Sequence, residues 1–459
     1  KSKVTQNALF KCLKNKIPFI PDERDSNRTT HTIRDAILIF FSAFFLHSKS
    51  LDSHFELLNS AKGCSNKSLF GIKALPSANQ IRNLIDPIET VHFCDVQDSI
   101  VYNMQRSGVL QQFKPSKSKW GYLISIDGFE FFRSKNLSCP ACNKAEHKDD
   151  TIDYFHRALL AGFVHPTEDI FLPFSQDFIM RQDGSTKEDC ERNSAKRWAE
   201  DFRRRHPQMR GTILADALHA NQPFLELLPQ NRLNFLIACK PGSNPYMFEW
   251  IDTLREGGDL KTFTKKYRKG KYWYESTYEY ANGVPIRDSN DALKVSFVME
   301  TIRLAGTDEV VGRHSFITNF TLENDQEAEE AACFGRKRWK SENEGHNTLK
   351  NQGYNINHNY GHGKENLANN AVVLCLIAMM MHVILAFVKQ EGFGLLRQIF
   401  STLHACMESI RSVFRIVGCR TELGKVFITV LEKGSIPLRI VRVLLMIRAS
   451  VPLTFERCL

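Results

Sequence analysis

The chain has 459 residues, of which 42% are hydrophobic and 24% charged, and its formal net charge is +10. This composition is that of soluble globular proteins and argues against a low-complexity chain, while the length leaves room for two or three domains. The positive charge favours a polyanionic partner, although many basic proteins have none. The opening residues KSKVTQNALF contain no apolar h-region, so we expect no secretory signal. The twelve scattered cysteines then indicate reduced thiols, with room for one metal site.

The first part of the chain is predicted to be helical. Thr32–Leu58 carries apolar residues at helical spacing without Gly or Pro, and Ser77–Asp86 starts with a serine suited to cap a helix. We therefore expect a helical domain over residues 1–115. A linker rich in Lys and Ser, QQFKPSKSKWG, follows it.

The next part, residues 116–244, alternates strands and helices. Apolar runs predict strands at 122–127, 154–164, 169–174, 211–216 and 234–240, and amphipathic patterns predict helices at 185–205 and 222–228. Ser185 or Thr186 could cap the first of these helices. This order of elements is typical of an α/β sheet.

Aromatic and β-branched residues interrupt the alternation over residues 245–312, which predict an antiparallel, β-rich insertion. Residues 313–390 return to a strand, a charged helix and the apolar run Ala371–Val388. That run is almost long enough to span a membrane, but we favour a buried core helix. Residues 391–459 are basic and predict one or two amphipathic helices.

Two aspartates stand at the ends of predicted strands, Asp127 after YLISI and Asp216 after GTILA. Side chains there emerge at the carboxyl edge of a sheet, where functional groups gather. Neighbouring carboxylates repel unless a hard cation such as Mg²⁺ lies between them. A third carboxylate on a packed helix would complete a two-metal phosphoryl-transfer site. Either aspartate alone is better explained as a turn residue, but their shared placement favours the metal site.

Three segments taken together, SIDGFEFFRSK, TILADALHA and RKRWKSENEG, resemble a DDE transposase of the bacterial insertion-sequence kind. QDGSTKEDCERNSAKRW, FLIACKPGSNPYMFEW and NQGYNINHNYGHGKENLAN also look like segments of one such lineage. The resemblance implies an α/β fold: an RNase H-like mixed sheet flanked by helices, with a β-rich insertion before the catalytic Glu and helical regions at both ends.

The resemblance also implies an activity. Asp127, Asp216 and Glu342 would hold two Mg²⁺ ions, or Mn²⁺ in their place, and the enzyme would cut transposon ends and join the 3′-hydroxyl to target DNA. Residues 1–115 would bind the terminal inverted repeats. A homodimer or larger synaptic complex, a cytoplasmic, nucleoid-associated location and no membrane partner are implied as well. Two alternatives stay open: a non-cutting DNA-binding protein derived from a transposase, and a stand-alone RNase H-like nuclease.

The third carboxylate is one of two glutamates in RKRWKSENEG. The family signature near this Glu is Tyr, Arg three residues later, Glu four further on and Lys seven after that. Here Gly335 replaces the Tyr, a serine replaces the apolar residue before the Glu, and Lys350 lies eight residues after Glu342. On a helical wheel, Arg338, Glu342 and Lys350 share one side, while Glu344 sits about 120° away. Glu342 is therefore the better candidate, with Arg338 and Lys350 binding DNA phosphate and Glu344 solvated or in a surface ion pair.

Cysteine and histidine form a second constellation in CPACNKAEH. Cys139, Cys142, His156 and Cys190 could bind a structural Zn²⁺, and His147 could replace one of them. The alternative is a pair of reduced thiols in a tight proline turn.

Several further segments keep two interpretations. Lys265–Tyr280 interleaves basic and aromatic residues, as either a DNA-contacting β-ribbon or a strand pair with one solvated face. HNYGHGKENLANN could bind DNA phosphate or cap the apolar helix. Asp183, Asp189 and Glu191 could bind metal, but a turn followed by the acidic first turn of a helix explains them better.

Overall fold

The computed structural model describes residues 2–25, 29–116, 119–180, 190–388, 400 and 402–416. The chain divides into two compact units: unit 1 comprises Lys1–Leu110, Phe131–His156 and Asn347–Leu459, and unit 2 comprises Gln111–Glu130 and Arg157–His346. The five sequence segments expected above remain predictions. Most of the basic region at 391–459 lies outside the described residues, as do Ser185, Thr186, Asp183 and Asp189.

The described strands form one ten-stranded mixed sheet, which confirms the α/β class. The strands are β1 Tyr122–Ser134, β2 Asn143–Glu146, β3 Ile152–Val164, β4 Phe171–Ile179, β5 Gly211–Ala215, β6 Asn234–Ala238, β7 Lys261–Lys269, β8 Tyr272–Pro285, β9 Lys294–Leu304 and β10 Val310–Thr318. Their order is β2-β3-β1-β5-β6-β10-β9-β8-β7, with β4 paired to β3. Strands β1, β5 and β6 are parallel neighbours, whereas β7 to β10 are antiparallel, as the sequence predicted for the insertion.

The parallel strands are short and apolar because helices cover them. Every residue of β5 is buried, the pattern expected of a strand packed on both faces. Helices α7 (Glu191–Arg205) and α8 (Gln222–Gln230) pack against β4 and β6 respectively. Trp198 of α7 is buried, and its indole N–H donates to Ser175 Oγ at 3.1 Å. This contact holds the middle of α7 against β4.

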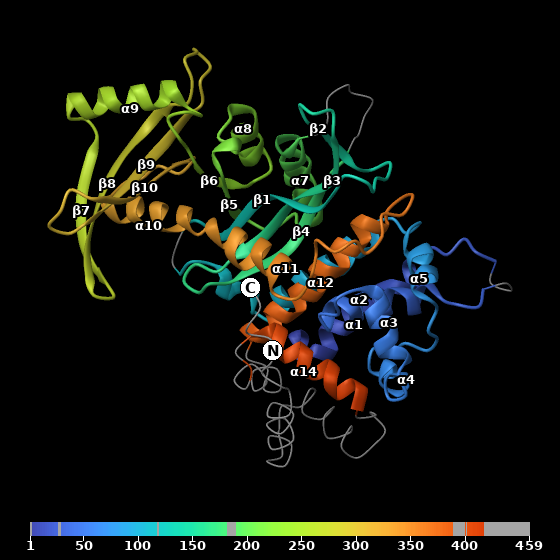
Figure 1. Cartoon of the computed structure of the whole chain (residues 1–459). Helices are drawn as coiled ribbons and strands as arrows, with labels where there is room; N and C mark the ends of the chain where they lie inside the picture. Colours follow the sequence, from blue (N-terminus) through green and yellow to red (C-terminus); the bar gives the residue numbers. More distant parts are fainter. Residues whose placement is uncertain are drawn as a thin grey trace. The chain divides into compact units, whose positions relative to one another are not determined.

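One helix of unit 2 was not predicted. Residues Pro245–Gly257 form α9, which packs against β8 within the segment expected to be β-rich (Figure 1). The signals were present, since a proline occupies the first turn and Gly258 ends the helix in the left-handed conformation, with φ 75°. The prediction missed this helix because it followed the aromatic and β-branched residues of the whole segment, which favour strands. Helix α10 (Asp325–Arg336) runs along β8, β9 and β10.

Unit 1 is built mainly from helices. They are α1 Gln6–Lys16, α2 Ile33–Phe45, α3 Leu51–Asn59, α4 Gly63–Asn66, α5 Ala78–Ile85, α6 Val91–Arg106, α11 Asn347–Asn351, α12 Leu367–Phe387 and α14 Leu403–Ile416. Short 3₁₀ turns in the chain are Ser2–Val4, Ile17–Phe19, Lys67–Leu69, Leu110–Phe113 and Ala217–His219. The capping role predicted for Ser77 is confirmed, because its side chain accepts from Gln80 N–H.

The long helix expected over Thr32–Leu58 is two helices. The chain turns at His47, whose φ is 52°, and Ser50 then caps α3 together with Ser53. Turn-forming polar residues therefore stopped a helix that the apolar spacing alone would have continued.

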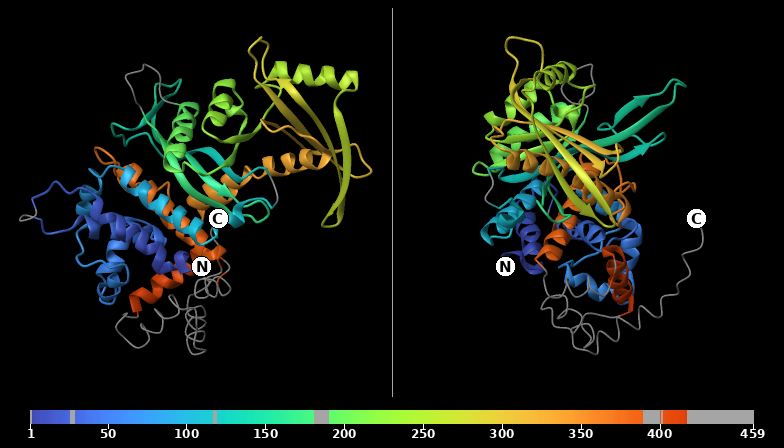
Figure 2. Two further views of the ribbon diagram at one scale, coloured as in Figure 1. Left: turned by 180° about the vertical axis from the view of Figure 1, so that it is seen from behind. Right: turned by 90° about the vertical axis from the view of Figure 1, so that its left-hand side faces the viewer.

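Helix α12 is the core of unit 1 and packs against α2, α5 and α6 (Figures 1 and 2). Among the described residues it is the one helix long and apolar enough to cross a membrane, and 83% of its most apolar 18-residue window is buried inside the protein. The prediction of a buried core helix is thus confirmed. Its first turn is capped from a distance by Asp86, whose carboxylate accepts from the four backbone N–H groups of residues 364–367 at 2.7–3.1 Å.

Candidate active site

The two aspartates lie level with each other, but only Asp216 follows the end of its strand; β1 continues to Ser134, so the prediction that Asp127 ends its strand was wrong. Strands β1 and β5 pair in parallel with Tyr122 opposite Gly211 and Ser125 opposite Leu214. Two residues further on, the same register places Asp127 opposite Asp216. Asp216 leaves β5 and caps the 3₁₀ turn Ala217–His219, accepting from Leu218 N–H at 3.0 Å. Asp216 therefore begins a turn, and it also lies level with Asp127 on the neighbouring strand.

A third acid, Glu191, joins them from the first turn of α7. Its carboxylate, Asp216 and His219 present ligand atoms within 4.8 Å of one another, and Glu191 Oε1 lies 3.0 Å from His219 Nε2. The next residue of β1 after Asp127 is Gly128, where a Cβ atom would lie 2.1 Å from Glu191 Oε2. Only glycine at this position lets the Glu191 carboxylate lie against the strand. The sequence correctly predicted that Glu191 lies in the first turn of a helix. Because Asp216 and His219 lie beside it, Glu191 stays a candidate metal ligand as well.

The charged segment after α10 supplies the fourth acid. Arg338 Nη1 donates to Glu342 Oε1 at 2.8 Å and lies 3.6 Å from Asp127 Oδ2. The Ser341 hydroxyl lies 3.3 Å from the same Asp127 oxygen. The serine that departs from the family signature thus provides a hydrogen bond where an apolar residue would provide none. Arg338 is 14% exposed, and the partners observed for it are the carboxylates of Glu342 and Asp127. Its contact with DNA phosphate stays a prediction.

Electrostatics single out Asp127. The pKa of Asp127 is raised from 3.8 to about 6, chiefly by burial; Arg338 opposes the rise, and the charges of Glu191, Glu342 and Asp216 add to it. Four mutually repelling carboxylates, of which Arg338 contacts only Asp127 and Glu342, are an unfavourable cluster when ionised. A hard divalent cation relieves the repulsion, because Mg²⁺ and Mn²⁺ prefer carboxylate oxygens. Glu191, Asp216 and His219 have ligand atoms close enough to hold such an ion, and Asp127 and Glu342 are the neighbouring carboxylates that could join them.

The backbone of this segment is not a regular α-helix. Ser341–His346 form a π-helical turn, a geometry often found at functional sites. Glu344 consequently faces Lys340 and Asp169 and is half-buried, and burial raises its pKa. Glu344 is therefore not fully solvated, and the alternative prediction of an ion pair stays open, with Lys340 as the neighbouring cation. Lys350 follows the π turn in α11 of unit 1, and its role beside Glu342 stays a prediction.

The glycine at the signature's tyrosine position has a packing reason. Gly335 is buried in α10, and a Cβ there would lie 2.6 Å from the ring of Phe316 on β10. No larger side chain fits between this helix and the sheet without displacing the ring. The departure therefore reflects close packing of α10 against β10.

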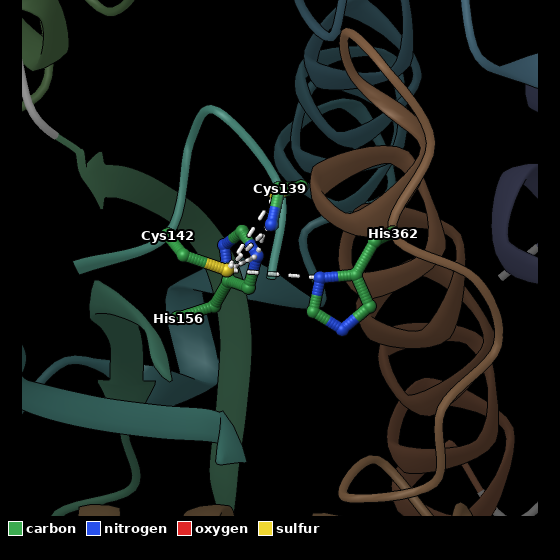
Figure 3. A group of neighbouring side chains, drawn as sticks. All are labelled: Cys139, Cys142, His156 and His362. Atoms are coloured by element: carbon green, nitrogen blue, oxygen red, sulfur yellow. Dashed lines mark hydrogen bonds between the residues drawn. The ribbon is translucent and has the colours of Figure 1, made fainter. Parts of the chain in front are cut away.

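The cysteine and histidine constellation is gathered in unit 1, with one change. Cys139, Cys142 and His156 lie together, and the fourth member is His362 from the loop before α12 (Figure 3). Cys190 was the wrong fourth ligand: it is an exposed residue of unit 2, at the N-cap of α7.

Strands β7 and β8 form the basic and aromatic ribbon. Between Lys261 and Tyr274 the sequence contains six basic and no acidic residues. No residue of β7 is buried, whereas Ser276, Tyr278 and Tyr280 alternate as buried residues along β8, so β8 has one solvated face and the contact with DNA stays a prediction. Tyr267, Tyr272 and Trp273 are 37%, 48% and 55% exposed. Exposed lysines also protect an edge strand such as β7 from unwanted pairing.

No family model matches the chain, and no curated protein does. Among solved structures, a cryo-EM structure of a piggyBac transposase synaptic complex with hairpin DNA matches over 95% of this chain and 86% of that chain, with 13% identical residues and a TM-score of 0.40. A likeness at this TM-score and identity assigns neither a fold family nor a function to the chain.

Proposed function

We propose that the protein is a DDE-type transposase of the bacterial insertion-sequence kind, which cuts transposon ends and joins the 3′-hydroxyl to target DNA. The observation that carries the proposal is the acidic cluster: Asp127 and Asp216 level on parallel neighbouring strands, with Glu342 and Glu191 beside them. The strand order β4-β3-β1-β5-β6 supports an RNase H-like core around that cluster.

The cluster's own contacts suggest how it is organised for phosphoryl transfer. When bound, Mg²⁺ would lower the barrier to attack on the phosphodiester and stabilise the leaving oxygen. Arg338 holds Glu342 and faces Asp127, so one guanidinium sets the direction of two carboxylates. His219 holds Glu191 in the same way, and it is itself 1% exposed. These second contacts restrict the carboxylates before any ion arrives, which lowers the entropy lost on binding.

Binding of DNA is assigned to the β7–β8 ribbon and to the helical N-terminal region. The ribbon offers aromatic rings for base stacking and lysines for phosphates, the two elements of sequence-tolerant binding to single strands. Lys269 lies opposite Tyr272 and Arg268 opposite Trp273 in its register. Tyr272 and Trp273 thus each have a cationic neighbour across the strand pair, whereas Tyr267 lies opposite Tyr274.

Cleavage of DNA tests the proposal. The full chain is incubated with Mg²⁺ and a duplex carrying the DNA that flanks its coding segment, with 3′-ends labelled. Asp127→Ala and Glu342→Ala are compared with Glu344→Ala, the matched control two residues after Glu342. We expect the intact protein and Glu344→Ala to cut and join, and the other two to bind DNA without cutting.

Three outcomes separate the alternatives. Cutting without joining to a second duplex supports a stand-alone nuclease. Binding without cutting by the intact protein supports a DNA-binding descendant of a transposase. Loss of cutting in Glu344→Ala but not in Glu342→Ala overturns the assignment of the third acid.

A further inference from the structure

The group of Cys139, Cys142, His156 and His362 has the dimensions of a tetrahedral metal site. Cys139 Sγ lies 3.6 Å from Cys142 Sγ and 3.3 Å from His156 Nε2. Cys142 Sγ lies 3.2 Å from His156 Nε2 and 3.7 Å from His362 Nδ1. Zn–S and Zn–N bonds of about 2.3 and 2.0–2.1 Å give tetrahedron edges of about 3.3–3.8 Å. The observed separations fall on these edges or within about 0.3 Å of them.

The two sulfur atoms are not bonded to each other, since a disulfide would bring them to about 2.05 Å. Cys142 and His156 are each 2% exposed, so the centre of the group is shielded from solvent. Phe131 stacks on the His156 ring at 5.5 Å, and Phe132 meets the His362 ring edge-on at 4.1 Å. A closed, ring-walled site with four protein donors is characteristic of structural rather than catalytic zinc.

The loop that brings His362 has a backbone suited to this placement. Gly361 and Gly363 flank it with φ of 125° and 67°, conformations that other residues rarely adopt. Added Cβ atoms would lie 2.6 Å from Leu367 and 2.1 Å from Asp86 respectively. The segment GHG therefore bends tightly between the helix cap and the cysteines, which accounts for a loop whose role the sequence left open.

The other candidate ligand, His147, is engaged elsewhere. Its Nε2 lies 3.1 Å from Asp153 Oδ2, which also accepts from Arg133. It therefore does not compete with His362 for the fourth position.

We propose that Cys139, Cys142, His156 and His362 bind one structural Zn²⁺ that ties the β1–β2 loop and β3 to the loop before α12. Cys142 and His362 are 220 residues apart in sequence, and the chain between them includes Arg157–His346 of unit 2, so the ion closes a long loop. Its role is to hold the start of the buried helix α12 against the β2–β3 hairpin. This site is independent of the acidic cluster and of the transposase proposal.

Metal analysis of the full-length chain tests this proposal. The protein is purified without a histidine tag, dialysed against excess Mg²⁺ to clear the carboxylates, and its metal content measured by mass spectrometry. We expect one zinc per chain. Cys142→Ser and His362→Ala should bind zinc more weakly than the intact protein. The loss of affinity should exceed the roughly 10–100-fold that follows removal of a residue that only supports a metal ligand. The matched control, Cys64→Ser, changes an exposed thiol of the same unit and should keep the zinc.

Replacement of zinc by Co²⁺ in the intact protein gives a readout that needs no variant. A tetrahedral site with two thiolates should show intense visible bands and a thiolate-to-cobalt charge-transfer band. Chelation should lower the Tm of the intact protein and of Cys64→Ser. A weak octahedral cobalt spectrum, a Cys139–Cys142 disulfide in peptide mapping, or undiminished zinc in a folded Cys142→Ser each overturns the proposal.

Discussion

Removal of the charge at Asp127 should stabilise the metal-free protein. Burial and neighbouring acids raise the pKa of this carboxyl from 3.8 to about 6. The folded state therefore binds the proton more tightly than the unfolded state, and the resulting stability is present below pH 3.8 and lost as the pH rises through about 6. The difference corresponds to at most about 3 kcal/mol. At pH 7.5 without divalent cations, Asp127→Asn should be more stable by up to that amount.

Thermal unfolding in EDTA measures the effect, at about 2–4 °C per kcal/mol for a domain of this size. The advantage of Asp127→Asn should shrink as the pH falls through 6 towards 4, since the wild-type carboxyl then takes up its proton. Mg²⁺ should raise the Tm of the wild type by mass action. It should raise that of Asp127→Asn much less.

The matched control is Asp177→Asn, in the same unit. Asp177 Oδ1 accepts from Ser194 Oγ and Arg197 Nη2, both at 2.6 Å, so its loss should destabilise by about 1.5–3 kcal/mol. A destabilised Asp127→Asn in EDTA at pH 7.5 would refute the reasoning, because the carboxylate would then be satisfied by the protein alone.

Three further variants test other parts of the structure. Gly128→Ala should weaken Mg²⁺ binding by roughly tenfold or more in a calorimetric titration, because the new Cβ displaces Glu191. Trp273→Ala should weaken binding of single-stranded DNA by about 5- to 150-fold in fluorescence anisotropy, the loss of one stacked base. Asp86→Ala should lower the stability of unit 1 by about 1–3 kcal/mol in urea unfolding, because four backbone N–H groups lose their acceptor.

Each of these has a contrary result. Unchanged Mg²⁺ affinity in Gly128→Ala would remove Glu191 from the metal site. Unchanged DNA affinity in Trp273→Ala would leave the β7–β8 ribbon as a protected sheet edge. Unchanged unfolding of Asp86→Ala would mean that water replaces the carboxylate at the start of α12.

Local patterns predicted much of the fold. Period-two and continuous apolar runs located the strands that became β1, β3, β5 and β6, and a capping serine located the start of α5. These features depend on neighbours a few residues apart, which the sequence displays directly. Helix α9 was missed because the aromatic and β-branched residues around it favour strands, although a proline and a glycine mark its two ends. The break after α2 was missed because the apolar spacing continues past it, although Ser50 caps α3.

The acidic site was predicted in part for the same reason. Asp127 and Asp216 each follow a short apolar run, and Arg338 and Glu342 are four residues apart, so short-range spacing was enough to select them. Glu191 could have been found only by noticing that the residue after Asp127 is a glycine, which leaves space for a second carboxylate.

The sequence by itself determined the α/β class, the buried nature of α12 and the residue types at both candidate sites, because hydrophobic periodicity and ligand chemistry belong to the residues themselves. Only the tertiary structure decided which side chains meet. The register of β1 on β5 set Asp127 level with Asp216, the π turn turned Glu344 towards Asp169, and a loop 220 residues away brought His362, not Cys190, to the cysteines. Each depends on the path of the whole chain, and residue spacing does not encode that path locally.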